Sequence, residues 1–427
     1  MSGEITVGDR LTDRIGIGVL TRLVSREAVD EVLAATGRRE KRSRLLPAHV
    51  MVYFIMAMAV FGDGYEEVMR RLVGGLQFMR AWKKEWSVPT TGAISQARER
   101  LGEAPMKALF ERIAEPLAVP GTPGAWLGSR RLMAIDGVKI DIPDTPANVG
   151  GFGRPGGALK RPFPQIQVIG LGECGTHAVV AAEIGTLSVG ERELAGKLTD
   201  ALEPGMLVMA DRGFFSFELW AELMATGADL LFRVPSHLKL PVSEALRDGS
   251  FISEIRSPRT RSSGHRIPLS AVGDPKRATH IPVRVVEYIV TGTAEGRDPD
   301  VLRVITTILD PEDLAAVEIA AAYHERWEYE IALKEIETQM LEPGGGLRSK
   351  SPELVRQELW GLLLTHYAIR SLMAEAAQSA GIDPDRLSFM RSINVVRRQV
   401  TDQAAFSPQT TCGRDSDDLR GDPPTGE

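Results

Sequence analysis

Apolar residues in the first part of the chain recur at the spacing of amphipathic helices. Over residues 1–118 they fall three and four positions apart, and no β-type run interrupts the pattern. Ser25 and either Thr90 or Thr91 are suitable N-caps for two of these segments. We therefore expect a helical N-terminal domain over residues 1–120, whose short helices suit either a DNA-reading helix-turn-helix or a scaffold.

The longest apolar run of the chain, residues 45–61, predicts a buried helix. It has 17 residues and contains Pro47 and His49, whereas crossing a bilayer takes about 20 consecutive apolar residues. The chain begins MSGEITVGDR, without the basic stretch and following apolar run of a secretory signal. We therefore expect neither a membrane span nor export.

The pattern changes after a stretch rich in Pro and Gly at residues 116–128, where we place a domain boundary near residue 120. Short apolar runs typical of strands then alternate with amphipathic stretches typical of helices. Strands are predicted at residues 130–142, 206–211 and 228–235, a hairpin at 165–186, and helices at 190–202 and 216–227. This alternation predicts a mixed α/β fold, a mixed sheet with crossover helices.

Helical periodicity disappears between residues 236 and 300, where Ser, Pro, Arg and Gly increase and short β-like runs remain. We interpret residues 236–300 as an inserted β subdomain. The core pattern returns at residues 301–309, and long helices are predicted at 311–340 and 351–378. Together these segments are expected to form one domain over residues 121–400.

The composition is that of an ordinary globular protein, with 43% hydrophobic and 25% charged residues among 427. Cys174 and Cys412 are too few and too far apart for a disulfide framework or a structural zinc site, which favours the reducing cytoplasm. The net charge is −6. Residues 401–427 form an acidic tail rich in Gly and Pro that we expect to be disordered.

Basic residues gather in two segments despite the negative net charge. Residues 37–44 carry five basic side chains against one Glu, and residues 254–285 carry seven against two acids. Either segment could follow a phosphate backbone or be a solvated loop. Arg259 and Arg261 in the second segment are candidate DNA contacts.

A further basic pair, Lys160 and Arg161, is a candidate for DNA contact. It follows residues 141–157, which the Pro and Gly content predicts to be a loop. The sequence GFGRPGG in this loop lacks the GK[ST] of a phosphate-binding loop. The pair would therefore touch DNA from a flexible loop.

Three acids lie where a sheet could bring them together. Asp136 follows the apolar LMAI of the first core strand, Asp211 ends LVMAD, and Glu330 lies on the long helix. If the first and fourth strands pair and the helix crosses them, the three carboxylates converge, and their mutual repulsion favours divalent cations. Two Mg²⁺ or Mn²⁺ ions about 3.5–4 Å apart could then support in-line phosphoryl transfer. Turn or cap residues are the alternative for a lone Asp.

The long helix places three functional groups on one face. Tyr323, Arg326 and Glu330 stand at i, i+3 and i+7. Arg326 could clamp a phosphate beside the metals while Glu330 binds one of them. A surface Arg–Glu pair is the structural alternative.

These motifs together resemble one known family. AIDG, ADRGFF and YHERWEYE, with LRSKSPELV further along, are similar to DDE-type insertion-sequence transposases of the insertion-element-four family. Over residues 10–400 the resemblance implies a ribonuclease-H-like catalytic domain with a β insertion between the second Asp and the Glu, preceded by a helical domain. It implies that Asp136, Asp211 and Glu330 bind the metals. Tyr323 and Arg326 would begin the Tyr-x2-Arg-x3-Glu-x6-Lys signature that contacts DNA.

The sequence departs from that signature at its last position. Glu337 stands where the family has Lys, and Lys334 could present its ammonium on the same face as Glu330. None of the six Trp lies in the β insertion, where relatives place a base-stacking Trp, and Phe251 and Tyr288 are the possible substitutes.

The resemblance implies a DNA transposase that uses two Mg²⁺ or Mn²⁺ ions to cleave and join strands. Its partners would be double-stranded DNA, namely the terminal inverted repeats of its element and the target, and it would act as a homodimer. Two alternatives stay open. Glu337 and the acidic tail motivate a catalytically inactive DNA-binding relative, and the same fold could also serve a metal-dependent nuclease.

Overall fold

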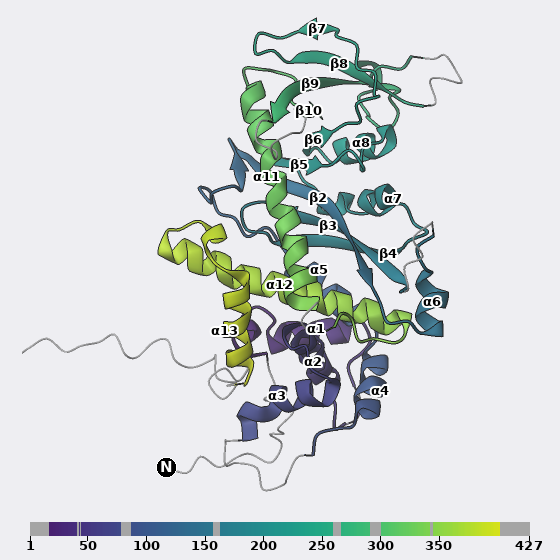
Figure 1. Ribbon diagram of the computed structural model, residues 1–427, viewed down its shortest axis with the longest axis vertical. Coiled ribbons are helices and arrows are strands. Elements are labelled where there is room, and N and C mark those ends of the chain that lie inside the picture. The colour runs from purple at the N-terminus through teal and green to yellow at the C-terminus, as the bar shows by residue number, and fades with distance from the viewer. Residues whose placement is uncertain are drawn as a thin grey trace, which may run out of the picture. The chain divides into compact units, whose positions relative to one another are not determined.

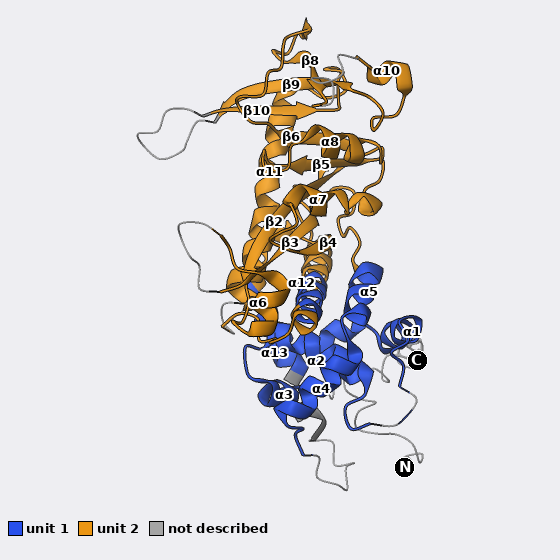
Figure 2. Cartoon of the chain, turned by 90° about the vertical axis from the view of Figure 1, so that its right-hand side faces the viewer, with its two compact units in different colours: residues 1–113, 356–369, 390–427 blue, residues 114–355, 370–389 orange. Residues whose placement is uncertain are grey.

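The computed structural model forms two compact units of helices and strands (Figures 1 and 2). It describes residues 17–40, 42, 44–77, 87–156, 163–258, 266–290, 300–341 and 345–401. Unit 1 comprises residues 1–113, 356–369 and 390–427, and unit 2 comprises residues 114–355 and 370–389. The division expected near residue 120 follows chain order, whereas two C-terminal segments group with the N-terminal helices because they pack there.

Unit 1 is helical, as its periodicity predicts. Its elements are η2 (Gly18–Arg22), α1 (Arg26–Ala35), α2 (Ala48–Val60), α3 (Tyr65–Gln77), α4 (Thr91–Leu101), α5 (Ala104–Ile113), the middle of α12 (Pro352–Ala380) and nearly all of α13 (Phe389–Thr401). The two predicted N-caps are confirmed. Ser25 Oγ accepts a hydrogen bond from Ala28 N at 3.2 Å, and Thr90 Oγ1 accepts one from Ala93 N at 3.3 Å.

The apolar helix α2 forms the centre of unit 1. All of its residues are buried, which confirms the buried helix predicted within residues 45–61. Gly361 of α12 lies so close to Ile55 that a Cβ at this position would collide with it. Among the described residues no single helix is long and apolar enough to cross a membrane. Helix α2 and the segment Tyr65–Val73 together have the length and composition of a membrane span, but they are bent by 110° relative to each other.

Unit 2 contains one large mixed sheet in the order β4-β3-β2-β5-β6-β10-β9-β8-β7, with β1 paired to β2. Its strands are β1 (Trp126–Leu127), β2 (Arg130–Asp141), β3 (Gln165–Glu173), β4 (Val179–Thr186), β5 (Met206–Ala210), β6 (Asp229–Arg233), β7 (Glu244–Ala245), β8 (Phe251–Arg256), β9 (His280–Val290) and β10 (Asp300–Thr306). The pairs β2–β5 and β5–β6 are parallel. The predicted mixed α/β class is thus confirmed.

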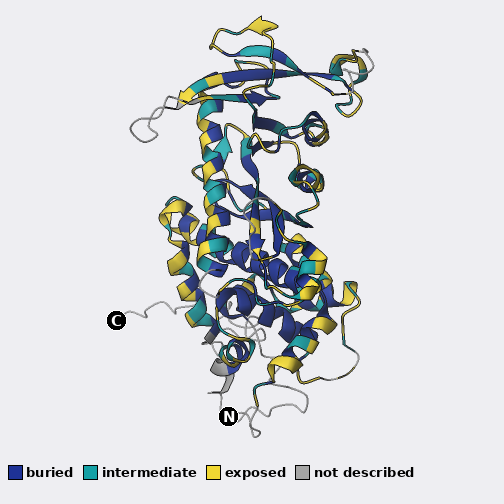
Figure 3. Ribbon diagram, turned by 45° about the vertical axis from the view of Figure 1, so that its right-hand side comes forward, coloured by how far each residue is buried: buried dark blue, intermediate teal, exposed yellow. Residues whose placement is uncertain are grey.

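Helices cover both faces of this sheet. The long helix α11 (Ala316–Lys334) contacts β2, β5 and β9, while α7 (Glu191–Gly196) and α8 (Phe217–Met224) pack on the opposite face (Figure 1). The central strands are buried between these layers (Figure 3). Shorter elements are α6 (Pro146–Phe152), η3 (Thr199–Ala201), α10 (Leu269–Val272), the π-helix η4 (Glu335–Leu341) and η6 (Pro384–Arg386).

Three local predictions need correction. The loop expected at residues 141–157 contains α6, which Thr145 caps by accepting a hydrogen bond from Asn148 N at 3.2 Å. The helix predicted to begin at residue 311 begins at Ala316, because a turn at Asp310 precedes it. The helix predicted at 190–202 is α7 followed by the short η3.

The β insertion extends the core sheet, since β9, β8 and β7 continue it beyond β10, the strand that pairs with β6. Arg284 of β9 is fully buried and donates to Ser250 Oγ at 2.8 Å and to Leu314 O at 2.6 Å, and it pairs with Asp248. Asp248 in turn accepts a hydrogen bond from Ala316 N, the first residue of α11, at 2.8 Å. Arg284 belongs to the basic segment 254–285, which was expected to follow a phosphate backbone or to be a solvated loop. For Arg284 this expectation is wrong, because the side chain is buried and joins the insertion to the start of α11.

Candidate functional site

The two aspartates lie side by side on parallel strands. In the register of β2 and β5, Ile135 is opposite Ala210, so Asp136, the next residue of β2, lies beside Asp211, which directly follows β5. Buried apolar residues precede both acids; β5 ends at Ala210, directly before Asp211, whereas β2 continues past Asp136 to Asp141. The pairing of the first and fourth predicted strands is therefore confirmed.

Helix α11 brings the third acid to the same place through Arg326. The guanidinium Nη1 lies 3.1 Å from Asp136 Oδ2, and Nη2 lies 2.6 Å from Glu330 Oε1. Tyr323, one turn earlier, donates a hydrogen bond from Oη to Ala210 O at 3.4 Å. The predicted face of Tyr323, Arg326 and Glu330 thus meets Asp136 in the middle of β2 and Ala210 at the end of β5.

Glycines on β3 set how closely α11 approaches the sheet. Tyr329 is fully buried, and a Cβ at Gly170 or Gly172 would collide with its phenol ring. Because both positions lack a side chain, the ring lies directly on β3 and holds α11 against the strand that pairs with β2. This close packing fixes Arg326 and Glu330 relative to Asp136.

The acids differ in their hydrogen bonding. Asp136 Oδ1 accepts from Gly137 N at 2.7 Å, and Oδ2 faces Arg326. Asp211 Oδ1 is buried without a hydrogen-bond partner, and a cation, Arg233 Nη1, lies 3.9 Å from it. Burial raises the pKa of Asp136, the Gly137 amide and Arg326 oppose that shift, and Glu330 and Asp211 add to it.

This donor set suits a hard divalent cation. The site offers three carboxylates, and the buried Asp211 Oδ1 lacks the hydrogen bond that a buried polar atom ordinarily makes. Carboxylate oxygens are the ligands that Mg²⁺ and Mn²⁺ prefer. The residues present therefore fit such an ion.

The other predicted contacts lie in varied surroundings. Lys334 is exposed at the end of α11, and Glu337 is half-buried in the π-helix. Tyr288 stacks edge-on against His324 of α11, with ring centroids 5.9 Å apart, whereas Phe251 is half-buried on β8. The candidates Lys160, Arg161, Arg259 and Arg261 lie outside the described residues.

Residue Arg233 was missed by reasoning from sequence, although a signal was present. It ends β6, the strand beside β5, and so reaches the same edge of the sheet as Asp211. Its position at the end of the apolar run ADLLF could have indicated it.

A second charged cluster, to which α11 contributes Glu328, was also missed, because its members are distant in sequence. His177 Nε2 lies 2.8 Å from Glu328 Oε2 and 3.1 Å from Asp385 Oδ1. These three groups have the spacing of a metal site. However, Arg370 donates to His177 Nδ1, so that Nε2 carries the hydrogen and donates to the acids. Arg370 also pairs with Glu335. We interpret the cluster as a hydrogen-bonded network.

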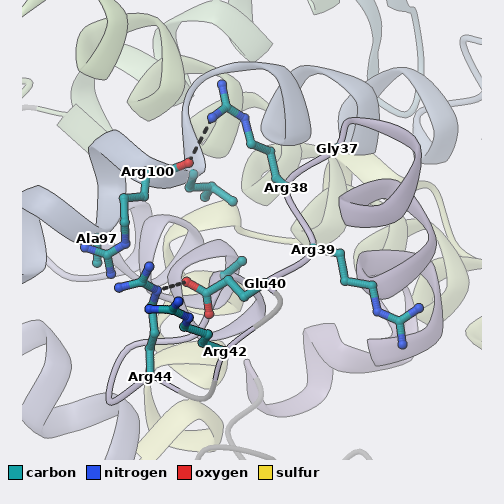
Figure 4. Close-up of a pocket in the computed structure, with 10 residues that line it drawn as sticks. Gly37, Arg38, Arg39, Glu40, Arg42, Arg44, Ala97 and Arg100 are labelled. Carbon is teal, nitrogen blue, oxygen red and sulfur yellow. Dashed lines mark hydrogen bonds and ion pairs between the residues drawn. The ribbon is translucent and has the colours of Figure 1, made fainter.

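In unit 1, arginines from the basic segment 37–44 surround a hollow of about 330 Å³ (Figure 4). Its cationic lining comprises Arg38, Arg39, Arg42, Arg44 and Arg100. Within it, Arg44 pairs with Glu40 at 3.3 Å, and Arg38 donates to Arg100 O at 3.2 Å. The remaining positive charge makes this hollow suitable for an anionic ligand.

Comparisons with known proteins agree along most of the chain. Residues 14–111 match the family described as insertion element 4 transposase N-terminal, and residues 127–367 match the transposase DDE domain. The chain is 30% identical over 385 residues to the transposase InsG for insertion sequence element IS4 of Escherichia coli K12, covering 90% of this chain and 82% of that protein.

Two further similarities are weaker. A putative transposase InsZ of the same organism is 24% identical over 236 residues, which is 55% of this chain and 76% of that protein. The piggyBac transposase in a synaptic complex with hairpin DNA has a TM-score of 0.47 and 12% identity, covering 90% of this chain and 79% of that one.

Proposed function

Because this chain belongs to the insertion-element-4 family of DDE transposases, we propose that Asp136, Asp211 and Glu330 are its catalytic metal ligands. The chain is a DNA transposase, an enzyme that cleaves and transfers DNA strands. The observation that carries the residue assignment is the adjacency of Asp136 and Asp211 on β2 and β5, with Glu330 linked to Asp136 by Arg326. A divalent metal is required by this class of enzyme, and we propose two Mg²⁺ or Mn²⁺ ions.

When bound, such ions activate the attacking oxygen and stabilise the leaving oxygen of an in-line phosphoryl transfer. The chain's own residues position the substrate. Arg326 can donate two parallel hydrogen bonds to a phosphate. Tyr323 donates to Ala210 O at the end of β5, and the ring of Tyr329 packs directly on Gly170 and Gly172 of β3, which positions α11.

DNA is the macromolecular partner of this enzyme class, and we propose where it is held. The arginine-lined hollow of unit 1 would bind phosphates of the terminal inverted repeats, and exposed cations of the β insertion would bind the backbone elsewhere. Lys334 would contact a phosphate near the cut, with Lys160, Arg161, Arg259 and Arg261 as further contacts. Because two ends react, we propose a homodimer, acting on its element and target DNA in the cytoplasm.

A strand-cleavage assay tests this function. DNA carrying the flanking repeats is incubated with wild type or Glu330→Gln in Mg²⁺, Mn²⁺ or EDTA, and nicked and joined products are separated. We expect metal-dependent nicking and joining that Glu330→Gln abolishes. DNA binding without products would indicate an inactive relative, and fragments without joining would indicate a nuclease.

A further inference from the structure

We propose that Arg326 couples metal binding to DNA binding, by leaving the carboxylates for a DNA phosphate when the metal enters. This inference rests on the proposed function, since it takes Asp136 and Glu330 as metal ligands. It goes further because it has Arg326 exchange one partner, the carboxylates of Asp136 and Glu330, for another, a DNA phosphate.

The first step of the argument is the set of oxygens that Arg326 occupies. Its Nη1 lies 3.1 Å from Asp136 Oδ2 and its Nη2 lies 2.6 Å from Glu330 Oε1. The second oxygen of Asp136 already accepts from Gly137 N at 2.7 Å. A cation bound to either oxygen of Asp136 would therefore lie close to the guanidinium at Oδ2, and two like charges repel each other at close range.

The second step is the position of the guanidinium itself. The Arg326 side chain is only 9% exposed, and its Nε is buried without a hydrogen-bond partner. A buried cation with an unused donor has low solvation, so losing both carboxylates to a metal would be costly unless another anion replaced them. A phosphate oxygen of DNA is such an anion and can accept from two N–H groups at once.

These two steps imply a thermodynamic linkage. Without DNA, Arg326 competes with the metal for the carboxylates and lowers its affinity. With DNA, the phosphate holds Arg326 and the carboxylates are released, so each ligand tightens the other by the same factor. The protein would then bind the metal mainly when DNA is present.

The test measures Mn²⁺ affinity by electron paramagnetic resonance, for the full chain with and without a duplex carrying the flanking repeats. In wild type we expect DNA to tighten Mn²⁺ binding by about 5–150-fold, the usual range for coupled sites. In Arg326→Gln, which keeps hydrogen-bond donors but removes the charge, we expect tighter Mn²⁺ binding than wild type without DNA and a coupling factor near one. Arg326→Lys, which keeps the charge, should retain part of the coupling.

Two controls separate the possible failures. Thermal unfolding shows whether each variant is folded, and Arg326→Lys replaces Arg326→Gln if the latter is not. Asp211→Asn removes a proposed ligand without touching Arg326, and it should weaken Mn²⁺ binding. If Asp211→Asn binds Mn²⁺ like wild type, the metal site and the proposed function are wrong. If it loses Mn²⁺ while Arg326→Gln keeps wild-type affinity and coupling, only the exchange is overturned.

Discussion

Helix α11 takes part in two charged clusters that differ in how completely their polar groups are paired. In the network of His177, Glu328, Asp385, Arg370 and Glu335, every described acid has a basic partner. In the carboxylate site, Asp211 Oδ1 and Arg326 Nε are both buried without a hydrogen bond. Since buried polar groups are almost always paired, the first arrangement is typical of a structural support and the second of a site that binds something else.

The division follows from helical spacing. Arg326 and Glu330 stand four residues apart on α11 and face Asp136 of β2, whereas Glu328 lies on another face of α11 and contacts His177. Glu335, the first residue of the following π-helix η4, contacts Arg370. Because one helix serves both clusters, the network can hold α11 while the carboxylates bind ligands. We therefore expect substitutions in the carboxylate site to affect chemistry, and substitutions in the network to affect stability.

The largest effect expected is that of Asp211→Asn on strand cleavage. Loss of a metal ligand removes several kcal/mol of transition-state stabilisation, so the nicking rate should fall by about a thousandfold or more. The melting temperature should stay unchanged or rise, because like-charge repulsion with Asp136 and Glu330 is relieved. Rates of nicking and thermal unfolding curves measure the two effects.

The matched variant in the network is Asp385→Asn. It should keep the wild-type nicking rate and lower the melting temperature, because it weakens the hydrogen bond from His177. If Asp385→Asn abolished nicking at an unchanged melting temperature, the contrast between the two clusters would be wrong.

The next effect in size is the loss of stability in Arg370→Met. The substitution leaves Glu335 and His177 buried without their partner. Breaking a buried pair by removing one member costs about 3–5 kcal/mol, which urea denaturation would measure. Arg303→Met is the control, since Arg303 pairs with Glu287 at the surface and such pairs contribute about 0–1 kcal/mol. Equal losses in both variants would contradict the structural role of the network.

A smaller loss is expected for Gly172→Ala. The new Cβ would meet the ring of Tyr329 and force α11 away from β3, at a cost of about 1–3 kcal/mol. Nicking should fall as well, because Arg326 and Glu330 move with the helix. Gly150→Ala in α6, where no atom lies within 4 Å, should be close to neutral. Adding Tyr329→Leu to Gly172→Ala should restore part of the stability, and failure to do so would point to a different clash.

The carboxylate site was the more predictable of the two clusters. Asp136 and Asp211 each end an apolar run, and parallel pairing of buried strands places such ends together. The spacing of Tyr323, Arg326 and Glu330 is enough to place all three on one helical face. What the sequence could not supply was the bridge from Arg326 to Asp136, because the rotamer of a long side chain depends on its packed surroundings.

The network could not be predicted, because its contacts join residues far apart along the chain. His177 and Arg370 are separated by 193 positions, and neither has a local pattern that indicates the other. The same holds for Arg284, whose sequence context suggested a DNA contact but whose partners, among them Asp248 and Leu314, bury it. A charged residue in the sequence is a sign of an exposed position only where the tertiary structure does not bury it.

The smallest expected effect lies at Lys334, the residue of α11 that directly precedes Glu335 of the network. Lys334 is exposed and one turn from Glu330, so Lys334→Ala should remove one phosphate contact. A plot of the logarithm of DNA affinity against the logarithm of salt concentration would then have a slope that is smaller in magnitude by about 0.9. Lys197→Ala, an exposed cation at the end of α7 on the opposite face of the sheet, should leave this slope unchanged. Glu337→Lys, which restores the family signature, should make this slope steeper if a phosphate passes this end of α11. An unchanged slope in all three variants would place the DNA elsewhere.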